Sequence, residues 1–513
     1  MVRTEGSDAA PIEQAADPDA DAPRTRHRDA IPWILAGVCL TWSLVFIHLG
    51  LQRHDRFGTF GFDLGIYDQA IWLLSRFHEP FITIRGLNFF GHHVNPILLL
   101  LVPFYWFGGG PHLLLVVQVA AQASGAVAVY LLARDLFGGA RWPALALAPV
   151  ILLHPSYQFM TWEFFHPDAL AVAPVLFAYW AARTRRWRWF ALSALVAVAC
   201  KEDVALAMAV MGLLIAARGD RRIGLVVAAL STAWFFVATR VIIPAANGIG
   251  PFYDTFFGEF GNSPGAVATR MLTHPGQVLD VVTRRDRLDY YRMMLSPFAF
   301  LPLVALPTFL IGAPMLAINT VSSFPYVREI KYHYAALVLA AAVLATVEAI
   351  ALLGRTPTIR AFLIGLVTAT SLAATVAWGP SPVSTQYRMG YWPLQPDSRA
   401  GAKAAAVALV PKGAAATVHY QYAPHMTHRT KIYEWPVPWK DVNWGVRGEH
   451  LDDPAGVQWI LLDRRILSPE DTALLDSLLA GQFAVRYDHQ DIMVAQRIRP
   501  PDAPPAAAAP GTG

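Results

Sequence analysis

Long apolar runs separated by short polar turns dominate the pattern of this chain. A membrane-spanning helix needs about 20 mostly apolar residues, within a range of about 17 to 25. Runs of this kind predict spans at 31–50, 112–133, 143–160, 169–182, 204–217, 223–243, 333–353 and 360–378, with a shorter helix that ends at Cys200. The run 296–321 contains four prolines and predicts two kinked or partial spans. The pattern therefore predicts an α-helical polytopic membrane protein with about 11 transmembrane helices.

Basic residues predict the orientation of these spans. Arginines at 24, 26 and 28 precede the first span, and the turns RDLFGGAR, RTRRWRW, RGDRR and GRTPTIR are also basic. Because Lys and Arg are enriched in cytoplasmic loops, we place the N-terminus and these turns in the cytoplasm. Two large outer loops then follow at 51–110 and 244–294. Within the first loop, VNPILLLLVPFYWF is short for a span, and we interpret it as interfacial or re-entrant.

Both ends of the chain differ from this apolar middle, which covers 31–379. Residues 1–30 are rich in Ala, Asp and Pro and predict a disordered cytoplasmic leader, because the first apolar run begins only at Ile31. Residues 380–497 have the composition of a soluble domain. In this segment QWILLD predicts a strand, SPEDTALLDSLLAG a helix capped by Ser468, and FAVRYDHQDIMVAQR a hairpin. We expect an extracytoplasmic α/β domain, followed by a disordered tail at 498–513.

Composition supports a membrane protein and excludes some other classes. Hydrophobic residues make up 55% of the chain, charged residues 15%, and the mean hydropathy is +0.38. The net charge is +4, but the arginines lie in short clusters between apolar runs, which argues against nucleic-acid binding. Cys39 and Cys200 both fall in apolar runs and indicate neither a disulfide framework nor a thiolate metal site.

The first candidates for chemistry are Asp63 and Asp68, which lie in GFDLGIYDQ just beyond the first span. The apolar spacing after Asp63 predicts an amphipathic helix that begins near this residue. A carboxylate held there could deprotonate an acceptor hydroxyl as a general base. Asp63 could equally be a helix cap, and Asp68 could be a solvated residue on the polar face of the helix.

Further polar side chains recur on the same predicted side of the membrane, where they could bind a substrate. They are His92, His93, Asn95, Glu163, His166, Asp168, Lys201, Glu202, Asp203, Arg328, Lys331 and His333. The imidazoles of GHHVNP could bind phosphate or ligate a metal, or they could simply be hydrated. The lysine of KED could pair with the neighbouring acids or bind a lipid phosphate. The basic REIKYHY could anchor a helix at the interface or take a phosphate.

Two further motifs each allow more than one interpretation. In EFFHPD the last acid could serve only the start of a helix, whereas its histidine has no such local role. In HYQYAPHMTHRTKIYEWP, three histidines stand beside many aromatic residues. Such aromatic residues could bind a sugar or form the core of the small domain, and the histidines could ligate a metal.

The layout resembles the GT-C superfamily of integral-membrane glycosyltransferases, in which a first span is followed by a large extracytoplasmic loop with an essential acid near its start. The motifs FDLGIYDQ, FHPDALA, KED, KYHYAA and PHMTHR resemble more closely an uncharacterised polytopic family, domain of unknown function 2079. The GT-C resemblance implies that Asp63 is the catalytic acid, with Asp68 as the second choice, because the usual Asp-Glu pair is absent. It also implies that a divalent metal (Mg or Mn) could take part, although no complete ligand set is legible.

The resemblance favours one function over two alternatives. We expect an inverting glycosyltransferase of the bacterial cytoplasmic membrane that moves a sugar from a polyprenyl-phosphate-linked donor to a glycan, lipid or protein acceptor outside the cell. The phosphate would be held by Lys201 or Lys331. A transporter or flippase is the first alternative, but the two halves of the chain are unlike and the charges lie at one face. The second alternative is a non-catalytic envelope protein that binds glycan.

Overall fold

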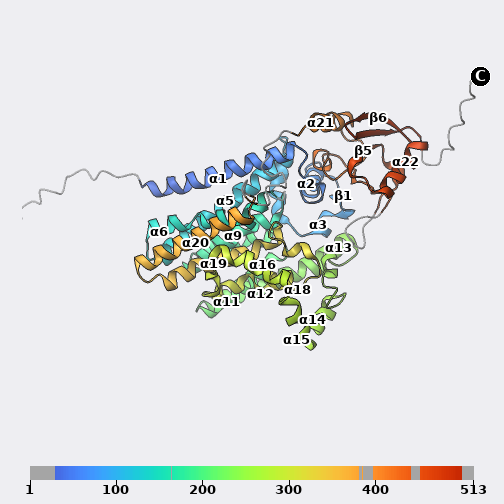
Figure 1. Cartoon of the computed structure of the whole chain (residues 1–513). Helices are drawn as coiled ribbons and strands as arrows, with labels where there is room; N and C mark the ends of the chain where they lie inside the picture. Colours follow the sequence, from blue (N-terminus) through green and yellow to red (C-terminus); the bar gives the residue numbers. More distant parts are fainter. Residues whose placement is uncertain (1–28, 163–164, 381–383, 385–396, 441–450, 500–513) are drawn as a thin grey trace, which may run out of the picture.

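The long helices of the chain gather into one bundle. The structure is a computed structural model that describes residues 29–162, 165–380, 384, 397–440 and 451–499. The C-terminal domain lies at one end of the bundle, which we call the domain end (Figure 1). Within the described residues, five helices are long and apolar enough to cross a membrane: Ala30–Asp55, Pro111–Leu136, Arg221–Asn247, His333–Leu353 and Pro357–Trp378.

Most of the apolar runs form the helices that the sequence predicts. The long ones are α1 (Ala30–Asp55), α5 (Pro111–Leu136), α12 (Arg221–Val237), α19 (Ala336–Leu353) and α20 (Pro357–Trp378). Three shorter apolar helices are α9 (Pro167–Arg183), α10 (Trp187–Cys200) and α11 (Val204–Ala217). The fold is therefore that of a polytopic helical protein, with several helices shorter than a full span.

Proline interrupts two of the apolar runs. The prediction of one continuous span at 143–160 is wrong, because this run forms α6 (Arg141–Leu147), α7 (Val150–Leu153) and α8 (Pro155–Trp162). His154 precedes Pro155 and is extended, with φ −68° and ψ 127°, as expected for a residue that proline keeps out of the helical region. The run 296–321 is broken as predicted, into 3₁₀ turns, α17 (Leu306–Phe309) and α18 (Ala313–Val321).

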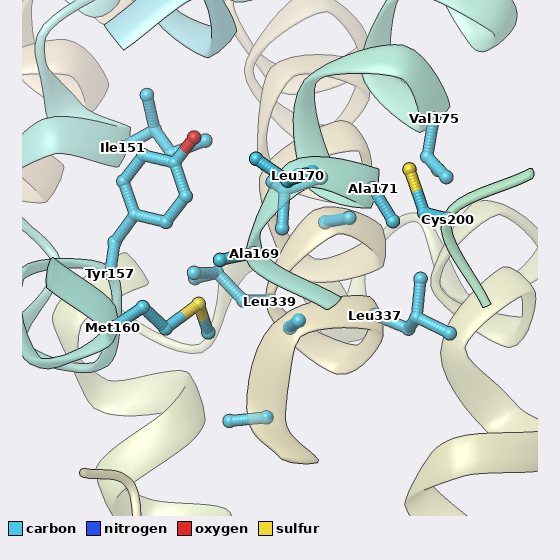
Figure 2. Packing of buried hydrophobic residues seen from close by; sticks show 14 of the residues in the cluster. Ile151, Tyr157, Met160, Ala169, Leu170, Ala171, Val175, Cys200, Leu337 and Leu339 are labelled. Atoms are coloured by element: carbon cyan, nitrogen blue, oxygen red, sulfur yellow. The ribbon is translucent and has the colours of Figure 1, made fainter. Parts of the chain in front are cut away.

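Helix α19 is the centre of the bundle. Every residue from Ala336 to Ile350 is buried, and the helix packs against α9, α5 and α17. Figure 2 shows Leu337 and Leu339 of α19 beside Leu170 and Ala171 of α9, with Cys200 at the end of α10 close by. A helix that is apolar on all sides is expected in such an interior position. Its many alanines let the neighbouring helices approach closely.

The segment 51–110 forms a compact layer between the bundle and the C-terminal domain. Its elements are α2 (Ile66–Ser75), β1 (Phe81–Ile82), β2 (Leu87–Asn88), α3 (Phe89–His92) and α4 (Val102–Tyr105). The predicted interfacial stretch is a 3₁₀ helix, Pro96–Leu101, followed by α4. It leaves Leu100 and Phe107 66% and 88% exposed, which suits contact with lipid at a membrane interface.

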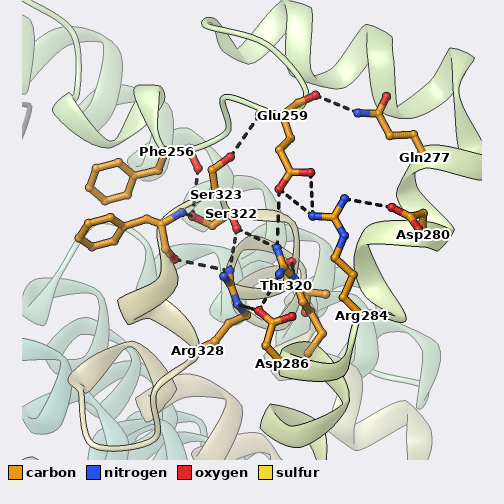
Figure 3. Close-up of polar contacts among 12 residues, drawn as sticks. Phe256, Glu259, Gln277, Asp280, Arg284, Asp286, Thr320, Ser322, Ser323 and Arg328 are labelled. Carbon is orange, nitrogen blue, oxygen red and sulfur yellow. Dashed lines mark hydrogen bonds and ion pairs between the residues drawn. The ribbon is translucent and has the colours of Figure 1, made fainter.

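The segment 244–294 is also helical, with α13 (Ile243–Asn247), α14 (Pro264–Thr273), α15 (Pro275–Val282) and α16 (Arg285–Leu295). Charged side chains join these helices to the preceding loop. Arg284 contacts Glu259 at 2.9 Å and Asp280 at 3.0 Å, as Figure 3 shows. The mixed-charge sequence TRRDRLDYYR therefore serves largely to fix this segment in place.

In its described residues, the C-terminal domain is a five-stranded mixed sheet with two α-helices. The strand order is β4-β3-β5-β7-β6, formed by β3 (Ala416–Val418), β4 (Ile432–Glu434), β5 (Trp459–Asp463), β6 (Phe483–His489) and β7 (Ile492–Arg497). The helices are α21 (Ala400–Leu409) and α22 (Pro469–Gly481). The predicted strand, hairpin and helix are confirmed, and the Ser468 side chain accepts a hydrogen bond from Asp471 N–H as the helix cap.

Backbone hydrogen bonds fix this domain against the 51–110 layer. Thr83 Oγ1 donates to Ile432 O at 2.6 Å and accepts from Ile432 N at 2.9 Å. Gly61 N donates to Tyr420 O at 2.9 Å. Residues far apart in the sequence thus meet through buried backbone groups, which places the start of the domain directly over the motif that contains Asp63.

Candidate active site

Lys201 is the centre of a buried polar cluster at the domain end. Its extended backbone, with φ −164° and ψ 153°, ends α10, and α11 begins three residues later. The ammonium lies 3.2 Å from Asp168 Oδ1 and 3.2 Å from Asp203 Oδ2. Lys201 is 4% exposed, and a buried lysine needs such partners to remain charged. Lys201 thus pairs with acids, and this pairing is compatible with a role in binding a lipid phosphate.

The start of α9 contributes a second part of the cluster. His166 is the residue before the helix, and its Nδ1 lies 2.5 Å from Asp168 Oδ2. Its backbone N–H donates to Gln118 Oε1 at 2.6 Å, and its Nε2 lies 3.2 Å from the hydroxyl of Tyr67. Pro167 occupies the first helical turn, as the sequence predicts. Glu163 lies outside the described residues.

The GHHVNP motif holds the connector between α10 and α11 in place. His93 Nδ1 lies 2.8 Å from Glu202 Oε1, and Val94 N donates to Glu202 Oε2 at 3.0 Å. Asn95 Nδ2 donates to Cys200 O at 2.6 Å. The His92 ring lies edge-on to His93, with 4.5 Å between centroids. All of these residues are buried, so the motif closes one wall of the cluster.

Asp63 approaches the cluster from the layer above. It lies in the π-helical turn Gly61–Gly65, just before α2. Burial raises the pKa of Asp63 to about 7, and the negative charge of Asp168 adds to the shift while Lys201 opposes it. The charges of Asp168 and Lys201 thus act on Asp63. A carboxyl with such a pKa is suited to accept a proton near neutral pH.

Asp68 has a different position and different partners. Its side chain is fully buried. Tyr105 Oη donates to its Oδ1 at 2.6 Å, Thr427 Oγ1 donates to its Oδ2, and His428 Nε2 lies 3.2 Å from the same oxygen. Thr427 and His428 belong to the C-terminal domain, within the PHMTHR motif. Asp68 therefore lies where the domain docks.

His333 joins the cluster from the start of the long apolar helix that contains α19. Its ring stacks on that of His166, with 3.3 Å between centroids and 6° between planes. His166, Asp168 and His333 each offer a ligand atom within 4.8 Å of the others. These three residues could hold a metal ion by their chemistry. The two imidazole planes are parallel, however, so their lone pairs do not converge on one point, and Lys201 already neutralises Asp168.

Arg328 and Lys331 lie away from this cluster. They line a separate cavity of about 380 Å³ with Asp286 and Glu329. Arg328 donates to Asp286 Oδ2 at 3.0 Å and to Ser322 O at 2.7 Å, as Figure 3 shows. Lys331 pairs with Glu329 at 2.9 Å. The structure brings the described residues of GHHVNP, FHPD and KED together with His333. It places Asp68 where the C-terminal domain docks and gives Arg328 and Lys331 acidic partners elsewhere.

A cavity of about 440 Å³ opens from the Lys201 cluster. Its polar end is lined by His93, Lys201, Asp203, Arg240, Tyr253 and Tyr334. Asp254, Asn319 and Ser322 also line it. Most of the remaining lining is apolar and includes Phe235, Phe236, Val267, Met271 and Met315. A second groove, of about 630 Å³, is lined almost entirely by apolar residues and reaches Cys200, next to Lys201. Two largely apolar cavities thus lie next to the charged Lys201 cluster.

Sequence reasoning missed several residues of this site. Tyr67, Tyr253 and Tyr334 line or contact the cluster, and Tyr253 Oη donates to Glu202 Oε1 at 3.0 Å. This chain is rich in aromatic residues, so the sequence does not distinguish a tyrosine of the site from a tyrosine that only packs in the core. Glu434, whose carboxylate accepts a hydrogen bond from the backbone N–H of Phe62, lies at the end of a strand that belongs to another domain, so no local pattern connects it with Asp63.

Residues 53–493 match the family described as Predicted membrane protein (DUF2079). The chain belongs to this family. The resemblance drawn from FDLGIYDQ, KED and the other motifs is thereby confirmed. A search of curated proteins finds no match.

Solved structures give the fold a second comparison. The chain is similar to ArnT from Cupriavidus metallidurans bound to undecaprenyl phosphate, with a TM-score of 0.54 and 12% sequence identity. The alignment covers 91% of this chain and 98% of that one. The apo state of the same protein matches with a TM-score of 0.54 and 13% identity. At this identity the likeness shows that the two proteins share a fold, and no more.

Proposed function

We propose that this family member is a glycosyltransferase that takes its sugar from a polyprenyl-phosphate donor. One observation carries the proposal: the cavity of about 440 Å³ is apolar along most of its walls and ends at the buried Lys201 cluster. An amphipathic substrate with an isoprenoid chain and a phosphate matches this division. The solved ArnT structure with undecaprenyl phosphate supports the same substrate class for a protein of this fold.

The proposed reaction is a single displacement at the anomeric carbon of the sugar. Asp63 accepts the proton of the acceptor hydroxyl, and the hydroxyl oxygen forms the new bond to that carbon. The bond between the carbon and the phosphate oxygen breaks, and the lipid phosphate leaves with the electron pair. Lys201, Tyr253 and Tyr334 line the cavity in which the leaving phosphate would gain charge, and the Lys201 ammonium would stabilise that charge. The configuration at the anomeric carbon inverts.

The charge at the polar end of the cavity favours a monophosphate donor. Lys201 and Arg240 are positive, but Asp168, Glu202 and Asp254 lie beside them. Burial raises the pKa of Asp203 to about 7, with Lys201 opposing the shift, so this carboxyl is partly protonated near neutral pH. A sugar phosphodiester adds one negative charge to this balanced site, whereas a diphosphate adds more and would meet stronger repulsion.

The proposed orientation follows the basic turns of the sequence. We place the chain in the bacterial cytoplasmic membrane, with the N-terminus in the cytoplasm and the domain end outside. The acceptor, whether glycan, lipid or protein, would then reach Asp63 from the extracytoplasmic side. Reporter fusions to the turns at 138–139 and 354–356 and to the C-terminal domain test this orientation directly.

Transfer from defined donors tests the function. Full-length protein in nanodiscs is supplied with undecaprenyl phosphates that carry radiolabelled hexoses or pentoses, together with membranes that serve as acceptor source. We expect transfer from one member of the panel. Asp63→Asn should lower the rate by about 10²- to 10⁴-fold, because a general base contributes about this factor. Asp476→Asn, at an exposed residue of α22, is the matched control and should retain the rate.

The proposal also predicts how the transfer rate depends on pH. A base must be ionised to act, and the pKa of Asp63 is raised to about 7. The rate should therefore rise from pH 6 to pH 8, pass half of its maximum near pH 7 and approach a plateau above about pH 8. A rate unchanged in Asp63→Asn would contradict the assigned base. Counterflow of the labelled lipid in proteoliposomes without sugar transfer would instead support a flippase.

A further inference from the structure

The cavity that contains Arg328 and Lys331 has no role in the reaction described so far. Its volume of about 380 Å³ falls within the range of about 300 to 1,000 Å³ that is usual for small-molecule sites. Its lining combines aromatic rings with charged side chains: Phe159, Tyr290, Trp378, Asp286, Asp289, Arg328, Glu329 and Lys331. With the orientation proposed above, α16, the loop before α19 and the last turn of α20 place this cavity at the outer end of the bundle. We call it the aromatic cavity.

Each acid of the aromatic cavity is paired with a base. The three pairs are Asp286–Arg328 at 3.0 Å, which Figure 3 shows, Glu329–Lys331 at 2.9 Å and Asp289–Arg292 at 3.3 Å. Because opposite charges balance in these pairs, the lining favours neither a phosphate nor an organic cation. The side chains of Asp286 and Glu329 are 50% and 42% exposed, and a carboxylate has about four acceptor sites. The pairs can therefore bond the hydroxyl groups of a neutral ligand.

The aromatic residues add a second kind of contact. Trp378 is the last residue of α20 and is partly exposed, and the Arg292 guanidinium lies 5.5 Å from the centroid of its ring. The face of an aromatic ring carries partial negative charge, so it attracts C–H groups. A sugar ring presents C–H groups on its faces and hydroxyl groups around its edge. Of the neutral ligands, a carbohydrate therefore matches both parts of the lining.

A thin wall separates the aromatic cavity from the cavity that ends at Lys201. Asn319 lines the Lys201 cavity, and Tyr290 lines the aromatic cavity. Asn319 Nδ2 donates to the Tyr290 hydroxyl at 3.0 Å and to Tyr334 O at 2.9 Å. Tyr334 also lines the Lys201 cavity. A single hydrogen bond between two side chains thus joins the linings of the two cavities.

The loop before α19 connects the aromatic cavity with the reactive cluster. Ile330 lines the cavity, and His333, which stacks on His166 of the cluster, follows three residues later. Three residues of extended chain span at most about 11 Å. A glycan of several sugar rings that is bound in the aromatic cavity can therefore reach the cluster with its terminal ring.

We propose that the aromatic cavity binds sugar rings of the acceptor, so that the acceptor is a neutral glycan. The inference rests on the proposed function and narrows its acceptor from a glycan, lipid or protein to a carbohydrate chain. A sugar ring packs on Trp378, and its hydroxyl groups bond the carboxylates of Asp286 and Glu329. No bond is made or broken in this cavity, because it only holds the glycan while the terminal hydroxyl reacts at the cluster.

Direct binding tests the cavity without any transfer reaction. Full-length protein in nanodiscs is titrated with maltotriose, cellotriose, mannotriose and chitotriose, and saturation-transfer NMR gives each Kd. We expect at least one trisaccharide to bind, with a Kd that changes less than about 2-fold between about 50 and 500 mM NaCl, because salt does not screen a neutral ligand. Inorganic phosphate and choline are the charged comparison probes. If no trisaccharide binds, or if phosphate or choline binds in their place, the proposal is overturned.

Two variants assign that binding to the aromatic cavity. Trp378→Leu removes the ring and should raise the Kd roughly 3- to 10-fold. Glu329→Gln replaces a charged acceptor by a neutral one and should raise it about 10-fold. The matched controls are Trp142→Leu, 61% exposed, and Glu470→Gln, 87% exposed, which lie outside the cavity and should keep the wild-type Kd. If Trp378→Leu does not fold, the partly exposed Glu329 decides the test. A wild-type Kd in the folded cavity variants would refute the site.

Transfer kinetics separate this proposal from the proposed function. Glu329→Gln should raise the KM for the acceptor about 10-fold, in step with the Kd, and leave the KM for the lipid-linked donor unchanged. A raised KM for the donor alone would show that the cavity holds the sugar of the donor, and the acceptor assignment would fail. If trisaccharides bind as expected but no donor is used, the glycosyltransferase function fails and the glycan site stands. If transfer occurs but no trisaccharide binds, the function stands and the site fails.

Discussion

Asp63 and Asp68 stand in one short motif, yet their side chains have unlike neighbours. Asp63 lies in the turn before α2 and interacts with Asp168 and Lys201, whereas Asp68 lies within α2 and accepts hydrogen bonds from Tyr105 and Thr427. A carboxylate beside another acid is destabilised in its ionised form, as the effect of Asp168 on Asp63 illustrates. At the scale of single residues, the partners of each carboxylate decide its role.

Lys201→Met tests the centre of the cluster. The substitution leaves the buried carboxylate of Asp168 without its cation, and breaking a buried ion pair in this way costs about 3 to 5 kcal/mol. We expect a lower melting temperature and weaker binding of undecaprenyl phosphate, measured by native mass spectrometry. The exposed Lys412→Met should change neither quantity.

The double variant Lys201→Met/Asp168→Asn separates stability from binding. It removes both charges and should recover part of the melting temperature. Binding of the lipid phosphate should remain weak, because the cation facing the cavity is still missing. Wild-type affinity in either variant would argue that Lys201 does not hold the phosphate.

At the scale of elements, the site is built where helices end. Lys201 stops α10, His166 precedes α9, and His154 marks the break before α8. Helix ends leave backbone groups without partners and let the chain turn, so polar side chains gather there while the helix interiors stay apolar. The close packing of the same helices then holds these ends in register.

The hairpin of α11 and α12 offers a test of that packing. A Cβ at Gly212 would lie 2.6 Å from the backbone nitrogen of Ala228, so Gly212→Leu forces the two helices apart. Overpacking of this kind costs about 1 to 3 kcal/mol, and we expect a lower melting temperature and a reduced yield of folded protein. Gly365→Leu in α20 meets no atom within 4 Å and is the matched control. Equal losses in both variants would show that the helix contact is not the cause.

At the scale of the whole molecule, the C-terminal domain is part of the site rather than an appendage. Its loop from 419 to 434 contacts the end of α1, the Asp63 turn and α2. His425 stacks on His54 with 4.1 Å between centroids, and His428 pairs with Asp68. His425 and His428 thus lie at an interface, whereas His419 accepts a hydrogen bond from Asp463 N–H inside the domain. Among the described residues these histidines form no metal ligand set.

Asp68→Ala tests whether docking supports activity. The substitution leaves the hydroxyls of Tyr105 and Thr427 without their acceptor, at a cost of about 1 to 3 kcal/mol each. We expect faster proteolytic release of the C-terminal domain and a matching loss of transfer. Asp476→Ala, on the exposed face of α22, should change neither. If Asp68→Ala loses transfer but resists protease as the wild type does, docking is not the cause, and Asp68 would become a candidate for the base.

Local sequence determined much of this protein. Apolar length set the helices, prolines set most of the breaks, Ser468 set a helix cap, and alternating residues set the hairpin of β6 and β7, because each depends on neighbours within a few positions. The same local reasoning took 143–160 as one span, since a proline at position 155 was weighed less than the apolar run around it. It also offered Arg328 and Lys331 as phosphate ligands. The structure pairs them with Asp286 and Glu329, and charge in the sequence alone does not reveal such partners.

Only the tertiary structure decided which polar residues meet. It joined His93 to Glu202, stacked His333 on His166, separated the tasks of Asp63 and Asp68, and brought Glu434 beside the Asp63 turn. The residues in each of these contacts are far apart in the sequence and belong to different elements. Their contacts depend on helix packing and domain docking, whose free energy comes from surfaces that no local pattern describes.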